Sequence, residues 1–277
     1  MQNSFEKSKV ILIERSPDMA FLNSLSISEK EPEKLYKFLF ETDNMLCKEE
    51  LLKIEKHTLI YLFLVRAYKL TSENTYIYNG VNPDYYAEII RFANVNFQRF
   101  GCFDITGNLL YHCYRYLLLN MVRLGRLSFE VKKYDFTFDV YSDNELFLSS
   151  DSWVLGIHIP GNDALTSDSV DESFRLAEGF FKKYHPDKNF KAYVCSSWLL
   201  DTQLRRFLKE DSNILSFQKR FIIKRGNEIP EALCDHIFAC PQTEPINLKP
   251  KNRFQREILD FILDGGRIYS GKGYILK

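Results

Sequence analysis

Hydrophobic positions recur three and four residues apart through much of the first 124 residues. One series runs through Tyr86, Ile89, Ala93, Phe97 and Phe100, and a second through Leu110, Cys113, Leu117, Met121 and Leu124. This spacing places apolar side chains on one face of a helix. The pattern therefore predicts a helical N-terminal region, with helices over both series.

After Gly125 the hydrophobic period falls to two. Apolar and polar residues alternate over 127–132 and again over 136–140, which predicts two strands of a sheet that is covered on one side. A third strand is predicted at 152–161, with Leu155 and Ile157 on one face and Gly156 and His158 on the other. The change of period marks the start of a second structural region.

The rest of the sequence alternates helix and strand patterns. An apolar stripe from Val170 to Tyr184 predicts a helix that begins with a capping box of Ser169 and Glu172. Asp201 is placed to cap a further helix. The other predicted elements are strands at 190–200, 220–225 and 267–276 and a helix at 252–265. We therefore predict an α+β protein, with a helical N-terminal domain over 1–122 and a second domain over 123–277.

Composition agrees with this division and restricts the function. Three of the 12 glycines and three of the nine prolines precede residue 124. Lys plus Arg and Asp plus Glu are each 37, and the signs also balance within each half, so no positive field for nucleic acid arises. The longest apolar run, Leu59–Val65, is far short of the ~20 residues of a spanning helix, and no signal peptide is expected. We expect a cytoplasmic protein that binds neither nucleic acid nor membrane; its oligomeric state stays open.

The cysteines do not suggest a metal site. The six of them include no Cys-x-x-Cys pair, and the five histidines do not cluster with them. A structural zinc ion is therefore not expected, and we interpret the cysteines as reduced thiols. Cys234 and Cys240 are close enough to raise the question of a disulfide, which the sequence leaves open.

Residues 182–189, KKYHPDKN, carry the His-Pro-Asp string with which J-domain co-chaperones engage their partner. The preceding helix is acidic, whereas the J-domain surface is basic because its partner is acidic. The residues that follow have the pattern of a strand, where a J-domain needs a helix. Lys182, Lys183 and Pro186 are explained equally well as the C-terminal end of a helix. We therefore set the co-chaperone interpretation aside.

Five segments of the second region together resemble a known family. They are LGRLSFE at 124–130, VLGIHIPG at 154–161, DES at 171–173, SSWLLDTQL at 196–204 and SNILSFQKRF at 212–221. Their order and spacing resemble bacterial acyltransferase-domain proteins, which join a helical N-acyltransferase-like N-terminal region to a GNAT-like C-terminal domain. The resemblance implies a mixed, mainly antiparallel GNAT-like sheet flanked by helices, with the helical N-terminal region packed on it.

The resemblance also implies where an acyl donor binds. In GNAT enzymes a strand lends backbone groups to the pantetheine arm of acetyl-CoA or another acyl-CoA, and a glycine-rich turn with a basic residue wraps the pyrophosphate at a helix N-terminus. The corresponding candidates are Ile157, Ile159, Gly161, Asn162, Ala164 and Thr166. The turn lacks the basic residue and the second glycine, and four acidic residues crowd the helix start, namely Asp163, Asp168, Asp171 and Glu172. These carboxylates are expected to repel a diphosphate.

Acyl transfer to an amine needs a base, and His158 and Glu130 are the candidate catalytic residues. Each also has a structural explanation, His158 as a hydrogen-bonded core histidine and Glu130 as part of a solvated strand face. Cys195, Ser196 and Trp198 are candidate substrate residues, because they lie near the point where a GNAT-like sheet opens. For Trp198, an aromatic anchor before a helix is an adequate alternative.

We therefore predict an acyl-CoA-dependent N-acyltransferase that transfers acyl groups other than amino-acyl groups to a small amine-bearing molecule, without a metal. The alternative is a non-catalytic GNAT-fold module that binds a metabolite or a protein partner, and the acidic helix start and the missing pyrophosphate signature favour it. Convergence of His158, Glu130 and the 160–166 loop in a cleft would favour the enzyme. Burial of His158 in purely apolar contacts would favour the module.

Overall fold

The computed structural model describes residues 67, 85, 87–89, 91–92, 112–113, 115–116, 119–143, 145–161 and 163–277. The chain forms two compact units, one made of residues 1–75, 84–97 and 102–118 and the other of residues 76–83, 98–101 and 119–277. All described residues of the first unit are helical. Within that unit Phe92 stacks on His112, with ring centroids 6.0 Å apart, and packs against Tyr116. Of the two predicted N-terminal helical series, Ile89 and Cys113 are helical and Met121 and Leu124 belong to the second unit; the other members lie outside the described residues.

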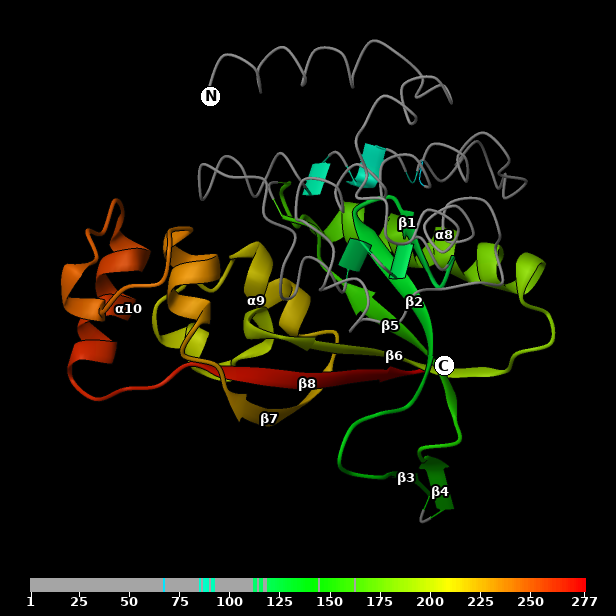
Figure 1. Cartoon of the computed structure of the whole chain (residues 1–277). Helices are drawn as coiled ribbons and strands as arrows, with labels where there is room; N and C mark the ends of the chain where they lie inside the picture. The colour runs from blue at the N-terminus through cyan, green and yellow to red at the C-terminus, as the bar shows by residue number, and fades with distance from the viewer. Residues whose placement is uncertain are drawn as a thin grey trace, which may run out of the picture. The chain divides into compact units, whose positions relative to one another are not determined.

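The second unit is built on a six-stranded mixed sheet with the order β1-β2-β5-β6-β8-β7 (Figure 1). Neighbouring strands are antiparallel except β5 and β6, which are parallel. The strands are β1 (Met121–Leu124), β2 (Leu127–Lys133), β5 (Trp153–His158), β6 (Phe190–Ser197), β7 (Ile222–Glu228) and β8 (Tyr269–Leu276). A separate hairpin joins β3 (Val140–Ser142) to β4 (Glu145–Leu148).

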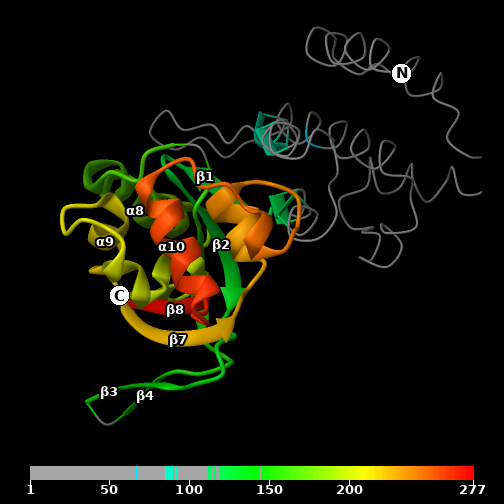
Figure 2. The same cartoon turned by 90° about the vertical axis from the view of Figure 1, so that its left-hand side faces the viewer.

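Three α-helices lie on this sheet, and Figures 1 and 2 place them on the side opposite the β3–β4 hairpin. They are α8 (Ser167–Tyr184), α9 (Asn213–Gln218) and α10 (Arg253–Leu263). Shorter helical turns are the 3-10 helices Trp198–Leu200, Thr202–Arg206 and Pro245–Asn247 and the π-helix Leu233–Phe238. No described helix is long and apolar enough to cross a bilayer.

The two faces of the sheet are covered differently. The face toward α8 carries Phe129, Leu155 and Ile157, which pack with Ala177 and Phe181 of the helix in the main hydrophobic core. The opposite face has a smaller core, in which strand residues are covered by the segment between β2 and β5. Its buried members are Tyr134, Val140, Leu148, Val154, Ala192, Val194 and Tyr274. Because β2 and β5 alternate between these environments, their period of two is accounted for.

Several element predictions are confirmed. The strands predicted at 127–132, 152–161, 190–200, 220–225 and 267–276 are present as β2, β5, β6, β7 and β8. The helices predicted over 170–184 and 252–265 are α8 and α10. Asp201 is an N-cap, since its carboxylate accepts a hydrogen bond from Gln203 N at 3.0 Å, although the helix it caps is only a 3-10 turn.

Three element predictions are wrong. Residues 121–124 form strand β1 rather than the end of a helix, because the neighbouring β2 supplies backbone hydrogen-bond partners. Residues 136–139 form no strand; instead, Phe136 and Phe138 pack against the smaller core on the sheet face opposite α8. The cap of α8 is Thr166, whose hydroxyl accepts from Ser169 N, so Ser169 does not begin a capping box.

Candidate functional site

The sheet opens at its centre. The register between the parallel strands β5 and β6 ends at the pair Gly156 and Val194. Both strands continue beyond this pair, β5 along β2 as far as His158 and β6 along β8 as far as Ser197. The two strands therefore stay bonded to their outer neighbours while they part from each other. Their C-terminal ends are therefore not paired with each other, and we call this interruption of the sheet the opening.

His158 and Glu130 meet beside this opening. His158 Nε2 lies 2.8 Å from Glu130 Oε2. The Glu130 side chain is 1% exposed, whereas that of His158 is 23% exposed. The structure therefore contradicts the solvated strand face proposed for Glu130, whereas the hydrogen bond of His158 agrees with a structural histidine as well as with a base. A buried carboxylate in this position orients the imidazole ring through the hydrogen bond.

Gly156 makes this arrangement possible. It is the register partner of Glu130 on β2. A Cβ atom at Gly156 would lie 2.9 Å from Lys132 Cδ and 3.5 Å from Glu130 Oε2. The absent side chain thus leaves the space in which the Glu130 carboxylate and the Lys132 stem lie side by side. Lys132 Nζ ends at Asp135, 2.5 Å from its carboxylate.

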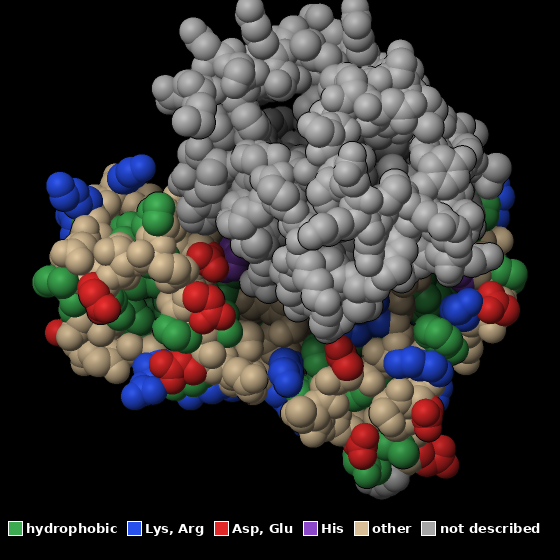
Figure 3. All heavy atoms as spheres, viewed as in Figure 1, with side chains coloured by type: hydrophobic (Ala, Val, Ile, Leu, Met, Phe, Trp, Pro, Cys, Tyr) green, Lys and Arg blue, Asp and Glu red, His purple; other side chains and the backbone are tan. Residues whose placement is uncertain are grey.

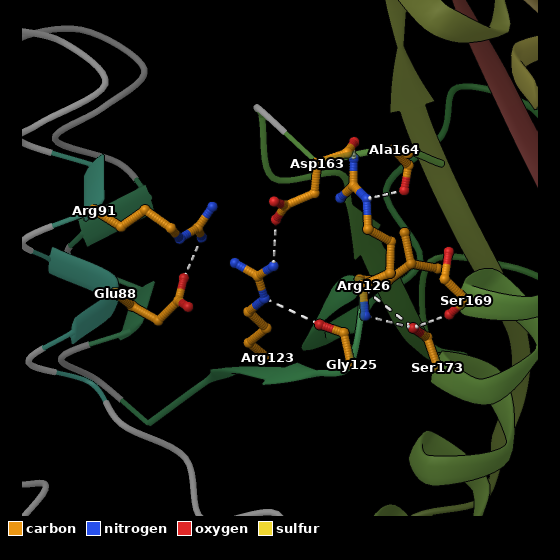
Figure 4. A network of polar contacts seen from close by, with 10 residues as sticks. Glu88, Arg91, Arg123, Gly125, Arg126, Asp163, Ala164, Ser169 and Ser173 are labelled. Carbon is orange, nitrogen blue, oxygen red and sulfur yellow. Dashed lines mark hydrogen bonds and ion pairs between the residues drawn. The ribbon is translucent and has the colours of Figure 1, made fainter. Parts of the chain in front are cut away.

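Two arginines hold the loop that joins β5 to α8 (Figure 4). Arg126 donates from Nε to Ala164 O at 3.0 Å and from Nη2 to Asp163 O at 2.7 Å. Arg123 donates from Nη2 to the Asp163 carboxylate at 2.9 Å and from Nε to Gly125 O at 3.0 Å. Both come from β1 and the turn that follows it. The basic residue that the loop sequence lacks is therefore supplied by a segment almost forty residues earlier.

The β1–β2 turn is fastened to α8 through Ser173. Ser173 Oγ accepts hydrogen bonds from the backbone N–H groups of Arg126 (2.8 Å) and Leu127 (3.2 Å) and donates to Ser169 O (2.8 Å). Gly125 has φ of +71°, and a Cβ atom there would lie 2.9 Å from Ser173 Oγ. Only glycine meets both requirements without strain. The turn therefore positions the two arginines against the loop.

The acidic start of α8 is largely neutralised. Three of its four carboxylates pair with arginines, namely Asp163 with Arg123, Asp171 with Arg220 and Glu172 with Arg175. Hydrogen bonds from the guanidinium groups lower the pKa of the Asp171 and Glu172 carboxyls. In the view of Figure 3, acidic and basic side chains are interspersed over the visible C-terminal part. The predicted repulsion of a diphosphate is therefore reduced by arginines, two of which, Arg123 and Arg220, are remote in sequence.

The predicted donor residues follow β5 without a break. The side chains of Ile157 and Ile159 point into the core beneath α8, so only their backbone groups can serve a ligand. Gly161 is exposed and Ala164 accepts the hydrogen bond from Arg126, while Thr166 caps α8. Asn162 lies outside the described residues.

The three predicted substrate residues have different surroundings. Ser196 is exposed on the same sheet face as His158. Cys195 is buried on the other face, where burial raises the pKa of its thiol to about 12, so it holds little thiolate near neutral pH. Trp198 stacks on the His236 ring, with centroids 6.0 Å apart, in the core beneath α10. Of the three, Ser196 is the side chain that faces the opening from the His158 side.

Comparison with known proteins places the second unit. A family model described as "GNAT-like C-terminal domain" matches residues 121–275, which is more than half of the chain. The chain belongs to this family. The match begins at β1 and ends in β8, so the whole GNAT-like sheet lies within it. A comparison with curated proteins finds no match.

Solved structures with the same fold are acyltransferases. An acyltransferase in complex with decanoyl-CoA aligns with a TM-score of 0.65 and 19% identity, covering 88% of this chain and 75% of the other. An acyltransferase mutant in complex with octanoyl-CoA aligns with a TM-score of 0.62 and 18% identity, covering 79% and 64%. A further acyltransferase, in complex with decanoyl-CoA and teicoplanin, aligns with a TM-score of 0.62 and 19% identity, covering 79% of this chain and 65% of the other. This GNAT-like chain therefore spans less than two thirds of the latter two proteins.

The described part of the GNAT-like chain offers no group of three His, Cys, Asp or Glu side chains arranged to hold a metal ion. The His-Pro-Asp string is the end of α8, where His185 N donates to Phe181 O and Pro186 begins a turn into β6. The motif is thus a helix terminus between a helix and a strand, as its sequence context predicted.

Proposed function

We propose that this protein is an acyltransferase that takes its acyl group from acyl-CoA and transfers it to the amine of a small molecule. The observation that carries the proposal is the His158–Glu130 pair beside the opening between β5 and β6. Membership of the GNAT-like family and the acyl-CoA complexes of structurally similar acyltransferases support it.

In the proposed reaction His158 is the base and Glu130 its positioning partner. With Glu130 ionised, His158 Nε2–H donates to the carboxylate, so Nδ1 is the atom that takes a proton. The amine nitrogen attacks the thioester carbonyl carbon and loses a proton to His158. The carbon–sulfur bond breaks, and the CoA thiolate leaves and takes up the proton that His158 accepted. Glu130 stabilises the imidazolium ion formed in the first step.

The donor is proposed to bind along the freed edge of β5 and at the start of α8. Backbone groups of Ile157 and Ile159 are assigned to the pantetheine arm. The turn at 161–166 and the N-terminus of α8, with Arg123 beside them, are assigned to the pyrophosphate. Pairing of three of the four acidic side chains with arginines weakens one of the two observations that favoured a non-catalytic binding module.

Two measurements test the function. Thermal-shift titration with CoA, acetyl-CoA and decanoyl-CoA should give a saturable rise in Tm for the acyl-CoAs, because a ligand of the native state stabilises it. Release of free CoA thiol, followed with a panel of amines, should then fall about 10²- to 10⁴-fold in His158→Ala and in Glu130→Gln, the usual contribution of a general base. Exposed Glu178→Gln is the matched control and should keep full activity.

The acyl-CoA titration decides between the two function classes. The base assignment is contradicted if both His158→Ala and Glu130→Gln retain the rate of the parent protein. Absence of any Tm shift with acyl-CoA would instead contradict the donor and return the protein to the class of binding modules.

A further inference from the structure

A row of polar side chains crosses one face of the sheet at the level of His158. Ser128 of β2 is the register partner of His158. Ser196 lies two residues beyond the last β5–β6 pair, as His158 does, and therefore faces it across the opening. Ser196 pairs with Lys272 of β8, which pairs with Lys224 of β7. Because register partners share a face, all five side chains stand on the side opposite α8.

Lys272 and Lys224 are an unusual pair within this row. Like charges directly opposite each other destabilise adjacent strands. Neither lysine forms an ion pair with any residue the structure describes, so the charge is not offset by a carboxylate there. Lysine on an edge strand discourages aggregation, which explains Lys224 on β7. It does not explain Lys272, because β8 lies between β6 and β7.

Two aromatic rings set the positions of these ammonium groups. Lys224 Nζ lies 4.1 Å from the Phe138 ring centroid, and Lys272 Nζ lies 5.7 Å from that of Phe136. Both rings belong to the segment between β2 and β3, which covers the sheet face opposite α8. A ring face attracts a cation but accepts no directed salt-bridge hydrogen bond, so the N–H donors remain available. The rings therefore hold two positive charges ready for an oxyanion.

We propose that Lys272 and Lys224 bind an anionic group of the acyl acceptor, a carboxylate or a phosphate. This inference rests on the proposed function and names its substrate class. In a regular sheet, strands about 4.8 Å apart would place the Cα atoms of Lys272 and Lys224 roughly 10 and 15 Å from that of His158, and the parting of β5 and β6 makes both separations larger. An acceptor that contacts both His158 and the lysines therefore has its amine and its anion several bonds apart. The donor phosphates are assigned to the start of α8, on the other side.

The test uses matched amines as acceptors. The probes are 6-aminohexanoate and 5-aminopentyl phosphate, with uncharged 6-aminohexanamide as reference and decanoyl-CoA as donor. The parent protein should use at least one anionic probe with a kcat/KM more than 10-fold above the amide. Lys272→Gln and Lys224→Gln should remove that preference through KM and leave the amide unchanged. Lys209→Gln, an exposed lysine in the loop before α9, should keep it.

Other kinetic results would overturn the inference. Equal use of charged and uncharged probes would do so, as would an equal loss for both in the lysine variants. A raised KM for decanoyl-CoA alone would assign the lysines to the donor instead.

A second measurement separates this inference from the proposed function. NMR chemical-shift titration without any donor should detect binding of an anionic probe but not of the amide, and Lys272→Gln should abolish it. That result supports the anion site even where acyl-CoA gives no thermal shift and the proposed function fails. Absence of probe binding in the parent protein overturns the anion site whatever the acyl-CoA result is.

Discussion

Arg126 offers a direct test of how the β5–α8 loop is held. Its guanidinium donates one hydrogen bond to the backbone carbonyl group of Asp163 and one to that of Ala164, and Arg126 is 8% exposed. Substitution by Met keeps a long apolar stem but removes both donors. The two carbonyl groups then lose their protein partner, and the loop loses its connection to the β1–β2 turn.

The expected magnitude follows from these two bonds. A hydrogen bond to a charged group contributes roughly 1.5–3 kcal/mol, and water reaching the freed carbonyl groups recovers part of it. Arg126→Met should therefore lower the free energy of unfolding by about 2–3 kcal/mol. If the loop binds the donor, loss of these two hydrogen bonds should also weaken acyl-CoA binding by about 10- to 100-fold, since ~1.4 kcal/mol corresponds to a factor of ten.

Urea unfolding measures the first quantity, and calorimetric titration with decanoyl-CoA measures the second. Arg126→Lys keeps the charge but loses the two-nitrogen fork, so it should recover less than half of the stability. Arg253→Met is the matched control, because its pair with Glu257 on α10 is largely exposed and contributes little. A stability change below about 0.5 kcal/mol in Arg126→Met, small by comparison with one charged hydrogen bond, would refute the role of these bonds. A stability loss with unchanged acyl-CoA affinity would refute the role of the loop in donor binding.

Three further predictions concern the scaffold. Gly125→Ala should destabilise the protein by about 2 kcal/mol in urea unfolding, because a left-handed residue costs roughly 1–2 kcal/mol and its Cβ atom meets Ser173 Oγ; a cost near zero would contradict this. Cys195 should resist iodoacetamide at pH 8 in the native protein and react once urea unfolds it, because burial raises its pKa to about 12; rapid labelling of native Cys195, followed by peptide mass spectrometry, would be inconsistent with that burial. Hydrogen bonding from Arg220 lowers the pKa of Asp171, so the pair stabilises the fold fully above the ordinary pKa of aspartate and ceases to do so as the pH falls through the lowered pKa. Asp171→Asn should therefore lower the free energy of unfolding more at pH 6 than at pH 3. Equal losses at the two pH values in urea unfolding would argue against the pair.

Much of the GNAT-like unit was predictable because its signals are local. Alternation along β2 and β5 and the stripe along α8 reflect one buried face each, and a buried face leaves a period in the sequence. Asp201 caps a helical turn through its own neighbours, so its residue type and position were sufficient. The same is true of the turn at Pro186 that ends the His-Pro-Asp string.

Tertiary structure decided the features that depend on remote partners. The apolar spacing of Met121 and Leu124 fits a helix, yet β2 offers a strand partner and β1 forms. Glu130 and His158 were individual candidates 28 positions apart, and only the antiparallel register of β2 and β5 brings their atoms within 2.8 Å. Arg126 reaches a loop whose own sequence lacks a basic residue.

The physical reason is the range of each interaction. Periodicity and capping report which groups are buried or bonded within a few residues, and these are determined by the sequence itself. Register, ion pairing and the opening of the sheet depend on which strands become neighbours, and a shift of one residue would turn His158 to the opposite face. The sequence by itself determined most elements of the GNAT-like unit and the residue types available for chemistry. The packed sheet decided which of those residues meet.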